Sequence, residues 1–288
     1  MIRRFIAMTV VLTLCAFTVH AQDAKIKTEK KIVYGKGDDV DLELDLAMPS
    51  EGKGPFPAVV CVHGGGWKAG NRQSLQALTE VLAKHNFVAV TVTYRLAPKY
   101  KFPAQIEDCK ASVRWLRANA EKYSINPDKI GAVGFSAGGH LVSLMGAADE
   151  KANLEGKGGN PKQSSKVQAV VSFFGPTDFV EKTWANDIEN IFFVPFIGGK
   201  FEDKKDVYRK ASPIVYCTKE CPPFLFFHGT KDLLVGIEHS QKMEKALKGL
   251  GVSAELVTME GDGHGWGGEK LTRTLNQTVR FFEEKLRK

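Results

Sequence analysis

The stretch Gly134-Phe135-Ser136-Ala137-Gly138 is the point from which the fold can be predicted. It follows an apolar run at 129–135 and leads into a helical pattern at 137–145. A G-x-S-x-G string between a strand and a helix is the context of a nucleophile elbow, a strained turn that exposes its serine hydroxyl. Glycine has no Cβ, so Gly134 and Gly138 let the strand and the helix approach closely. The string alone also fits a serine in an ordinary glycine-rich turn.

Strands and helices alternate along the rest of the chain, which favours an α/β fold with a mostly parallel central sheet and helices on both faces. An antiparallel edge hairpin is expected first, because residues 40–46 alternate between apolar and acidic side chains. Residues 177–213 mix aromatic and charged side chains without a strand pattern, which predicts a small helical insertion over one edge of the sheet. We expect residues 22–288 to form one domain. The ranges predicted as strands are 30–34, 40–46, 56–62, 87–94, 129–135, 167–174, 224–227 and 254–259, and those predicted as helices are 71–85, 104–123, 137–145, 236–250 and 268–286.

Residues 1–21 are typical of a signal peptide. Two arginines form a positive n-region, residues 5–19 form an apolar h-region, and Val19-His20-Ala21 offers a small-residue cleavage site. The apolar run is short for a helix that spans a bilayer. We therefore expect a secreted or periplasmic protein that starts near Gln22 and has no stable membrane insertion. An uncleaved N-terminal anchor is the alternative.

Charge and cysteine content narrow the classes of partner. The formal net charge is +7, but no basic block alternates with aromatic residues, so nucleic-acid binding is not expected. Cys61 and Cys109 lie in an apolar strand and a helix, where buried thiols are common. Cys217 and Cys221 are close enough in sequence for a disulfide in an exported protein, and the paired and free forms both stay open. No set of residues has the spacing of metal ligands, so no metal site is predicted.

A serine hydroxyl needs a base to become a nucleophile, and histidine is the usual base. His264 is the candidate because it lies in the glycine-rich loop 261–266 after the last strand, from which it can reach the active end of the sheet. The other histidines of the mature chain have structural or surface explanations. We expect structural roles for His63, His140 and His228, and surface positions for His85 and His239.

The base needs an acid that orients it. Asp232 follows the strand 224–227 and is the first choice, because the order Ser136, Asp232, His264 is the order of an α/β-hydrolase triad. Asp178 also follows a strand and competes for the role. Asp262 is a weaker candidate, because it is too near His264 in sequence to aim at it well.

A tetrahedral intermediate needs backbone N–H donors, and glycine lets the backbone come close to a ligand. The run His63-Gly64-Gly65-Gly66-Trp67 stands at the end of the strand 56–62. The main-chain N–H groups of Gly65, Gly66 and Ala137 are therefore the predicted oxyanion hole. Five aromatic side chains could line a substrate pocket, or they could form the insertion's own small core. They are Trp67, Phe192, Phe193, Phe196 and Trp266.

Together these motifs resemble the α/β-hydrolase serine esterases of the hormone-sensitive-lipase type and the exported acetylxylan and feruloyl esterases. Tyr94-Arg95-Leu96-Ala97-Pro98, Gly175-Pro176-Thr177-Asp178 and His228-Gly229-Thr230-Lys231-Asp232 match segments usual in that group. The resemblance covers about residues 40–286. It implies a serine carboxylesterase with Ser136, Asp232 and His264 as the triad and without a metal or organic cofactor.

The resemblance also sets expectations for the substrate. The residues before 40 do not match the long N-terminal cap of the hormone-sensitive-lipase branch, so the cover of the site is expected mainly from residues 177–213. Export and family analogy favour short acyl (acetyl) or aromatic-acid esters, as small molecules or linked to polysaccharide. An amide hydrolase, of the peptidase or arylformamidase kind, would use the same triad. A non-catalytic binding protein on this fold is the third alternative, and the presence of every triad residue speaks against it.

Overall fold

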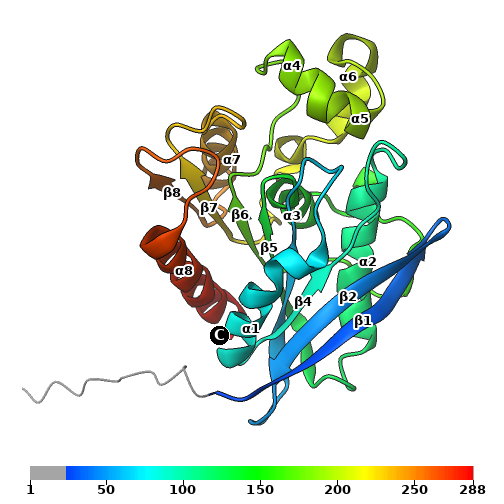
Figure 1. Cartoon of the computed structure of the whole chain (residues 1–288), viewed down its shortest axis with the longest axis vertical. Helices are drawn as coiled ribbons and strands as arrows, with labels where there is room; N and C mark the ends of the chain where they lie inside the picture. The colour runs from blue at the N-terminus through cyan, green and yellow to red at the C-terminus, as the bar shows by residue number, and fades with distance from the viewer. Residues whose placement is uncertain (1–23, 288) are drawn as a thin grey trace, which may run out of the picture.

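The computed structural model describes residues 24–287 (Figure 1), so the predicted signal peptide lies outside the described residues. The core is one eight-stranded sheet with the strand order β1-β2-β4-β3-β5-β6-β7-β8. Strands β1 and β2 pair antiparallel, β2 also runs antiparallel to β4, and the remaining neighbours are parallel. The predicted mostly parallel sheet with an edge hairpin is confirmed. The strands are β1 (Ile26–Gly37), β2 (Val40–Pro49), β3 (Phe56–Val62), β4 (Val88–Val92), β5 (Ile125–Phe135), β6 (Ala169–Phe173), β7 (Phe224–Gly229) and β8 (Ala254–Met259).

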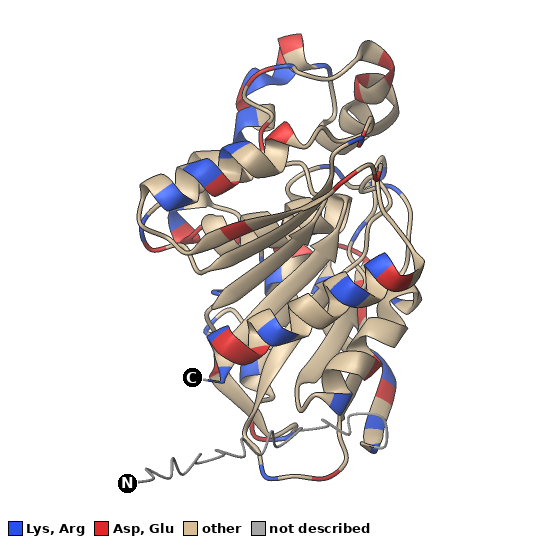
Figure 2. Cartoon of the chain, turned by 90° about the vertical axis from the view of Figure 1, so that its left-hand side faces the viewer, with Lys and Arg blue, Asp and Glu red and all other residues tan. Residues whose placement is uncertain are grey.

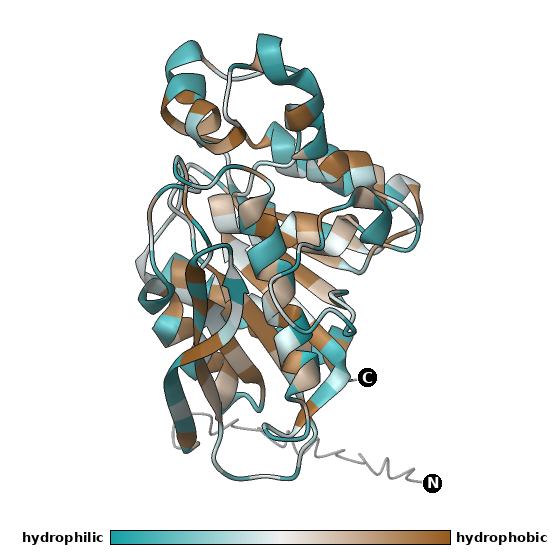
Figure 3. Cartoon of the chain, turned by 90° about the vertical axis from the view of Figure 1, so that its right-hand side faces the viewer, coloured by the Kyte–Doolittle hydropathy of each residue, from teal (hydrophilic) through white to brown (hydrophobic). Residues whose placement is uncertain are grey.

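Helices cover both faces of the sheet because the central strands are apolar on both sides. The side chains of β3 alternate between two cores: Ala58 and Val60 pack with one set of helices, and Val59 and Cys61 pack with the other. The first set is α2 (Ala104–Ala118), α3 (Ala137–Ala147) and α7 (Glu238–Gly249), and the second set is α1 (Gln76–Lys84) and α8 (Gly268–Leu286). Charged residues gather on the outer helices and loops (Figure 2), whereas the strands between them are largely hydrophobic (Figure 3).

Several element ends differ from the predictions by a few residues. The hairpin strands are longer than expected because β1 already begins at Ile26. Helix α2 ends at Ala118 instead of residue 123, since turns follow it. Strand β5 begins at Ile125, and a register shift between Phe56 and Ala58 on β3 accommodates the Asn126-Pro127 step.

The insertion at 177–213 is helical, as predicted, but it lies above the carboxyl ends of the central strands instead of along a side edge of the sheet (Figure 1). Its elements are α4 (Asn186–Ile188), a π-helical turn (Glu189–Phe193), α5 (Val194–Ile197) and α6 (Phe201–Lys210). It has its own aromatic core, in which Trp184 stacks on Tyr208 with 5.7 Å between ring centres and Phe193 lies 4.4 Å from Trp184. Part of the aromatic content of the insertion therefore holds the insertion together.

Among the helices of residues 24–287, none combines the length and the apolar character that crossing a membrane requires.

Candidate active site

The predicted elbow forms between β5 and α3. Ser136 has φ 54° and ψ −118°, a backbone conformation that L-residues rarely adopt, and its N–H donates to the Phe173 carbonyl at 2.9 Å. Gly134 and Gly138, on either side of the elbow, cannot carry a side chain because backbone atoms of other residues lie too close to them. A Cβ on Gly138 would lie 2.1 Å from the Val62 carbonyl oxygen, and a Cβ on Gly134 would lie 2.2 Å from the Gly138 carbonyl oxygen. The packing of backbone on backbone keeps the serine in its strained position.

The structure brings the three predicted triad side chains together. His264 Nε2 lies 2.8 Å from Ser136 Oγ, and His264 Nδ1 lies 2.7 Å from Asp232 Oδ2. The two competing carboxylates point elsewhere, since Asp178 pairs with a lysine of α7 and Asp262 pairs with a lysine of α8. Of the three acids considered from the sequence, Asp232 is the one that reaches His264.

Asp232 is held in its ionised form. Its other oxygen, Oδ1, accepts the backbone N–H groups of Leu234 and Val235 at 2.9 Å each. Burial alone would raise the pKa of Asp232, but hydrogen bonds from His228, His264 and the backbone outweigh it and lower the pKa below its usual range. The stability that this carboxylate contributes is therefore complete above the unfolded-state pKa of about 3.9 and is lost as the pH falls through the lower folded-state pKa.

The glycine run after β3 curls toward Ser136. Gly65 has φ 115° and Gly66 has φ 59°, and a Cβ on Gly66 would lie 2.5 Å from the Phe192 ring. The Gly65 carbonyl accepts from the N–H of Ala69 at 3.0 Å, which closes the turn. Within residues 24–287, the N–H groups of Gly65 and Gly66 donate to no backbone oxygen. Both glycines line the same pocket as Ser136.

Trp67 anchors this loop to its surroundings. Its Nε1–H donates to His140 Nδ1 on α3 at 3.1 Å, and its ring stacks on Phe196 of the insertion with 4.2 Å between centres. The N–H of Ala97 donates to the Trp67 carbonyl oxygen at 2.9 Å. His140 in turn donates from Nε2 to the Ala211 carbonyl at 2.7 Å, and burial lowers its pKa to about 4, so it stays neutral near pH 7. A neutral imidazole offers Trp67 the acceptor that this contact requires.

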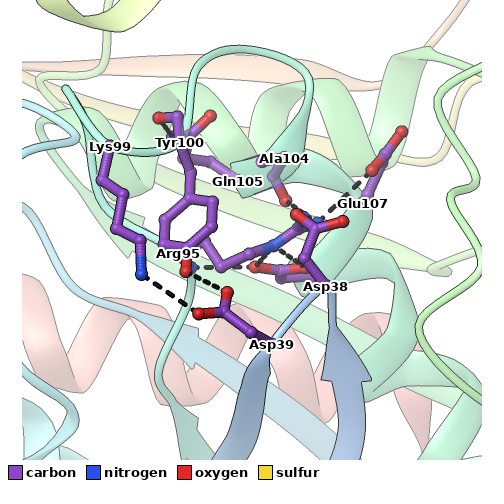
Figure 4. A network of polar contacts seen from close by, with 9 residues as sticks. Asp38, Asp39, Arg95, Lys99, Tyr100, Ala104, Gln105 and Glu107 are labelled. Carbon is purple, nitrogen blue, oxygen red and sulfur yellow. Dashed lines mark hydrogen bonds and ion pairs between the residues drawn. The ribbon is translucent and has the colours of Figure 1, made fainter.

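The segment Tyr94–Pro98 supports the glycine loop from the other side, and Arg95 fixes that segment (Figure 4). Arg95 binds the buried Asp108 of α2 through Nε and Nη2 at 2.9 and 2.7 Å, and it also reaches Asp38 in the turn between β1 and β2. The preceding Tyr94 donates its hydroxyl to the His63 carbonyl at 3.1 Å. A buried guanidinium thus ties the edge hairpin and α2 to the segment 94–98, whose Tyr94 and Ala97 hydrogen-bond to the glycine loop.

A largely apolar pocket of about 370 Å³ opens above Ser136. Of the five aromatic residues predicted to line it, Trp67, Phe192 and Phe193 do so. Two of the five do not. Phe196 is fully buried behind Trp67, and Trp266 packs against Phe173 and Phe174 while its Nε1–H donates to Thr274. The aromatic residues predicted a pocket lined by rings, but the sequence did not show which way each ring points.

Other lining residues were missed by the sequence reasoning. Phe174 is the clearest case, because its φ of 41° is strained for a bulky residue and its ring centre lies 4.7 Å from that of His264. It directly follows β6, so its place at a strand end was the available signal. The lining residues that were not predicted for the pocket are Gly64, Phe135, Phe174, Pro176, Ile188, Leu234 and Val235.

The remaining histidines include one wrong prediction. His239 was expected at the surface but is buried, and its Nδ1 accepts the N–H groups of Thr177 and Asp178 at 3.3 and 3.2 Å. Burial lowers its pKa to about 4. It therefore serves as a neutral acceptor that joins α7 to the start of the insertion. His63 stacks on Tyr94 at 4.3 Å, in the structural role that was expected.

Metal-binding side chains do not gather within residues 24–287, where no group of three or more His, Cys, Asp or Glu residues could hold an ion. The four cysteines in this part of the chain have free thiols. Cys61 and Cys109 are buried as predicted, and Cys217 and Cys221 are half-buried and not bridged.

Comparison with known proteins finds a match to one protein family. The BD-FAE family matches residues 44–247. Esterase LipC of Mycobacterium tuberculosis is 32% identical over 251 residues, which cover 82% of this chain and 59% of LipC. The matches to the first three curated relatives span 47–59% of the length of those proteins.

Two solved structures have the same fold over most of their length. A truncated form of a carbohydrate esterase from gut microbiota superposes with a TM-score of 0.80 at 28% identity, covering 91% of this chain and 97% of that chain. The propionate-bound esterase Est2 of the planctomycete Thermogutta terrifontis superposes with a TM-score of 0.75 at 28% identity, covering 92% and 95%. The α/β-hydrolase fold expected from the sequence is confirmed.

The glycine contacts at the elbow can be tested by stability. Gly138→Ala forces a Cβ into the Val62 carbonyl, and we expect it to lower the free energy of unfolding by about 3 kcal/mol. Gly249→Ala is the matched control, because a Cβ at this last residue of α7 meets nothing within 4 Å. Gly249→Ala should raise the free energy of unfolding by about 0.4–1 kcal/mol, because alanine reduces the conformational entropy of the unfolded chain. Urea unfolding followed by circular dichroism measures the free energy of unfolding of both variants. Equal changes in the two variants would contradict the backbone contact at Gly138.

Proposed function

This chain belongs to the BD-FAE family, and on that premise we propose that it is a carboxylic ester hydrolase with Ser136 as its nucleophile. The observation that carries the proposal is the continuous hydrogen-bonded chain from Asp232 through His264 to Ser136, with contacts of 2.7 and 2.8 Å, at the floor of an apolar pocket. Nucleophile, base and orienting acid in this geometry can perform acyl transfer.

The proposed reaction has two halves. Ser136 Oγ bonds to the ester carbonyl carbon while its proton passes to His264 Nε2. The tetrahedral intermediate then collapses, the C–O bond to the alcohol breaks, and the alcohol leaves with the proton from His264. In the second half a water adds to the acyl-serine with His264 as base. Collapse releases the acid and returns the proton to Ser136 Oγ.

Asp232 and the backbone donors act on the charges that develop. Asp232 is held as a carboxylate, so it orients the Nδ1–H of His264 and stabilises the imidazolium of the intermediate. The N–H groups of Gly65, Gly66 and Ala137 are proposed to hold the oxyanion. The closed turn supports this role, since Gly65 and Gly66 have positive φ and the Gly65 carbonyl accepts the N–H of Ala69 at 3.0 Å.

The nucleophile is tested by Ser136→Ala. Removing Oγ should lower kcat for p-nitrophenyl acetate by roughly 10⁴–10⁶-fold, because no acyl-enzyme can form. The wild-type chain should also be labelled by a fluorophosphonate, and the alanine variant should not. Near-normal turnover by the variant would falsify the assignment. A wild-type chain that resists the label would favour the binding-protein alternative, and faster cleavage of an acetyl anilide than of the acetyl ester would favour an amide hydrolase.

For the substrate we propose short-chain (acetyl) or aromatic-acid esters, carried by a small molecule or by polysaccharide. The name of the gut carbohydrate esterase supports an ester whose alcohol belongs to a polysaccharide. The apolar lining of the pocket supports an acyl group that is itself apolar, because the polar groups at its floor are those of Ser136, His264 and the backbone. A sugar hydroxyl would find few partners there, so the acyl group is proposed to enter and the alcohol to stay at the mouth.

Acyl selection can be measured with Phe192→Ala. The Phe192 ring lines the pocket, so its loss should lower kcat/KM for p-nitrophenyl butyrate and for a feruloyl ester by about 10-fold, and less for the acetate. Ile191→Ala is the control on the same helical turn. Its side chain is 46% exposed and outside the pocket, so kcat/KM should not change for any ester. Equal losses for all three esters in Phe192→Ala would count against an acyl pocket.

We also propose export to the periplasm or the medium, on the strength of the sequence pattern at residues 1–21. Expression in a bacterial host with separate analysis of cell fractions tests this. The exported protein should start near Gln22 by N-terminal sequencing. A product that still starts at Met1 and sediments with membranes would support the uncleaved anchor instead.

A further inference from the structure

A second histidine, besides His264, contacts the carboxylate of Asp232. His228 is the fifth residue of β7 and is fully buried. Its Nε2 lies 3.4 Å from Asp232 Oδ2, the same oxygen that accepts from His264 Nδ1 at 2.7 Å. Neither the esterase mechanism above nor the sequence motifs assign His228 a part in the reaction.

The neighbours of His228 define which of its nitrogens carries the proton. Nε2 lies 2.8 Å from the Val235 carbonyl oxygen, which can only accept, so Nε2 must carry a hydrogen. Nδ1 lies 2.8 Å from the hydroxyl of Ser240 on α7. The hydroxyl can donate to Nδ1, which leaves the ring neutral and both of its nitrogens satisfied. The Nε2–H then donates to the Val235 carbonyl at 2.8 Å and has Asp232 Oδ2 as a longer contact at 3.4 Å.

We propose that His228 is a positioning residue for Asp232, with its tautomer set by the Val235 carbonyl and its Nδ1 held by Ser240, so that a chain of polar contacts runs through five side chains from Ser240 to Ser136. This inference rests on the proposed function. Its physical content is that Oδ2 faces a second N–H group, at 3.4 Å, from the end of β7. The carboxylate is thereby gripped at both oxygens, since Oδ1 is already held by the N–H groups of Leu234 and Val235.

The contact between His228 and Asp232 matters when His264 becomes positively charged during the reaction. His264 becomes an imidazolium during each half-reaction and pulls on Oδ2, so a carboxylate held only by its backbone contacts could rotate. A displacement of about 1 Å in such a chain can cost roughly 10²-fold in rate. The effect should therefore appear in kcat, because Asp232 lies behind His264 and is not among the residues that line the pocket.

Two substitutions separate positioning from packing. His228→Gln retains an amide N–H near the place of Nε2 and an oxygen that can accept from Ser240, so its kcat for p-nitrophenyl acetate should stay within about 3-fold of wild type. His228→Leu has similar bulk and no donor, and its kcat should fall by about 10- to 100-fold with KM unchanged. If both variants have the same kcat, or if only KM changes because the Val235 wall has moved, the proposal is overturned.

A double-mutant cycle gives the decisive measurement. If His228 acts through Asp232, then His228→Leu should cost less than about 3-fold in kcat when Asp232 is already Asn. A cost in that background as large as in the wild type would show an independent, structural role and overturn the proposal. Ser240→Ala removes one buried hydroxyl and should lower kcat by about 3- to 10-fold. It covers the case in which His228→Leu does not fold, because an unchanged kcat in a folded Ser240→Ala variant also contradicts the proposal.

The failure of this inference can be told apart from the failure of the proposed function. Thermal unfolding first confirms that each variant is folded, and the fluorophosphonate label counts the reactive serines. Esterase activity that depends on Ser136 but not on His228 would remove only the positioning role. Activity that does not depend on Ser136 would remove the function itself.

Discussion

The structure of this site depends on close backbone packing at the end of β3, where the elbow and the glycine run meet. A Cβ on Gly138 would meet the carbonyl oxygens of Val62 and His63, and a Cβ on Gly64 would lie 2.8 Å from the Phe135 carbonyl oxygen. Two turns from different parts of the chain therefore share one space because neither carries side chains there. Ser136 keeps its strained conformation only as long as this packing holds.

The insertion and the glycine run are joined through aromatic contacts. Trp67 continues the glycine run, bonds to His140 of the elbow helix and stacks on Phe196 of the insertion. The ammonium group of Lys68 lies 2.8 Å from the Ile191 carbonyl oxygen and 5.2 Å from the centre of the Phe192 ring. The cover that shapes the pocket and the loop that offers the backbone donors therefore form one packed unit.

The parts of the site that could be predicted share one property, which is a position in the turn or loop that follows a strand. Ser136, Asp232 and His264 each follow a parallel strand in a turn rich in glycine, and parallel strands bring such turns to one edge. The parts that were missed or wrong depend on the direction of a side chain. Phe196 and Phe192 are four residues apart in the same insertion, yet one supports Trp67 and the other lines the pocket. No local pattern distinguishes them.

From the sequence it was possible to predict the alternation of strands and helices, the two glycine-rich turns and the order of the proposed triad residues, because these follow from local periodicity and from residues with special backbone or chemical properties. Tertiary structure alone decided that Phe196 and Trp266 do not line the pocket, that His239 is buried, and that His228 contacts Asp232. Such facts arise from contacts between segments far apart in the chain, whose distances depend on how the whole sheet and its helices pack.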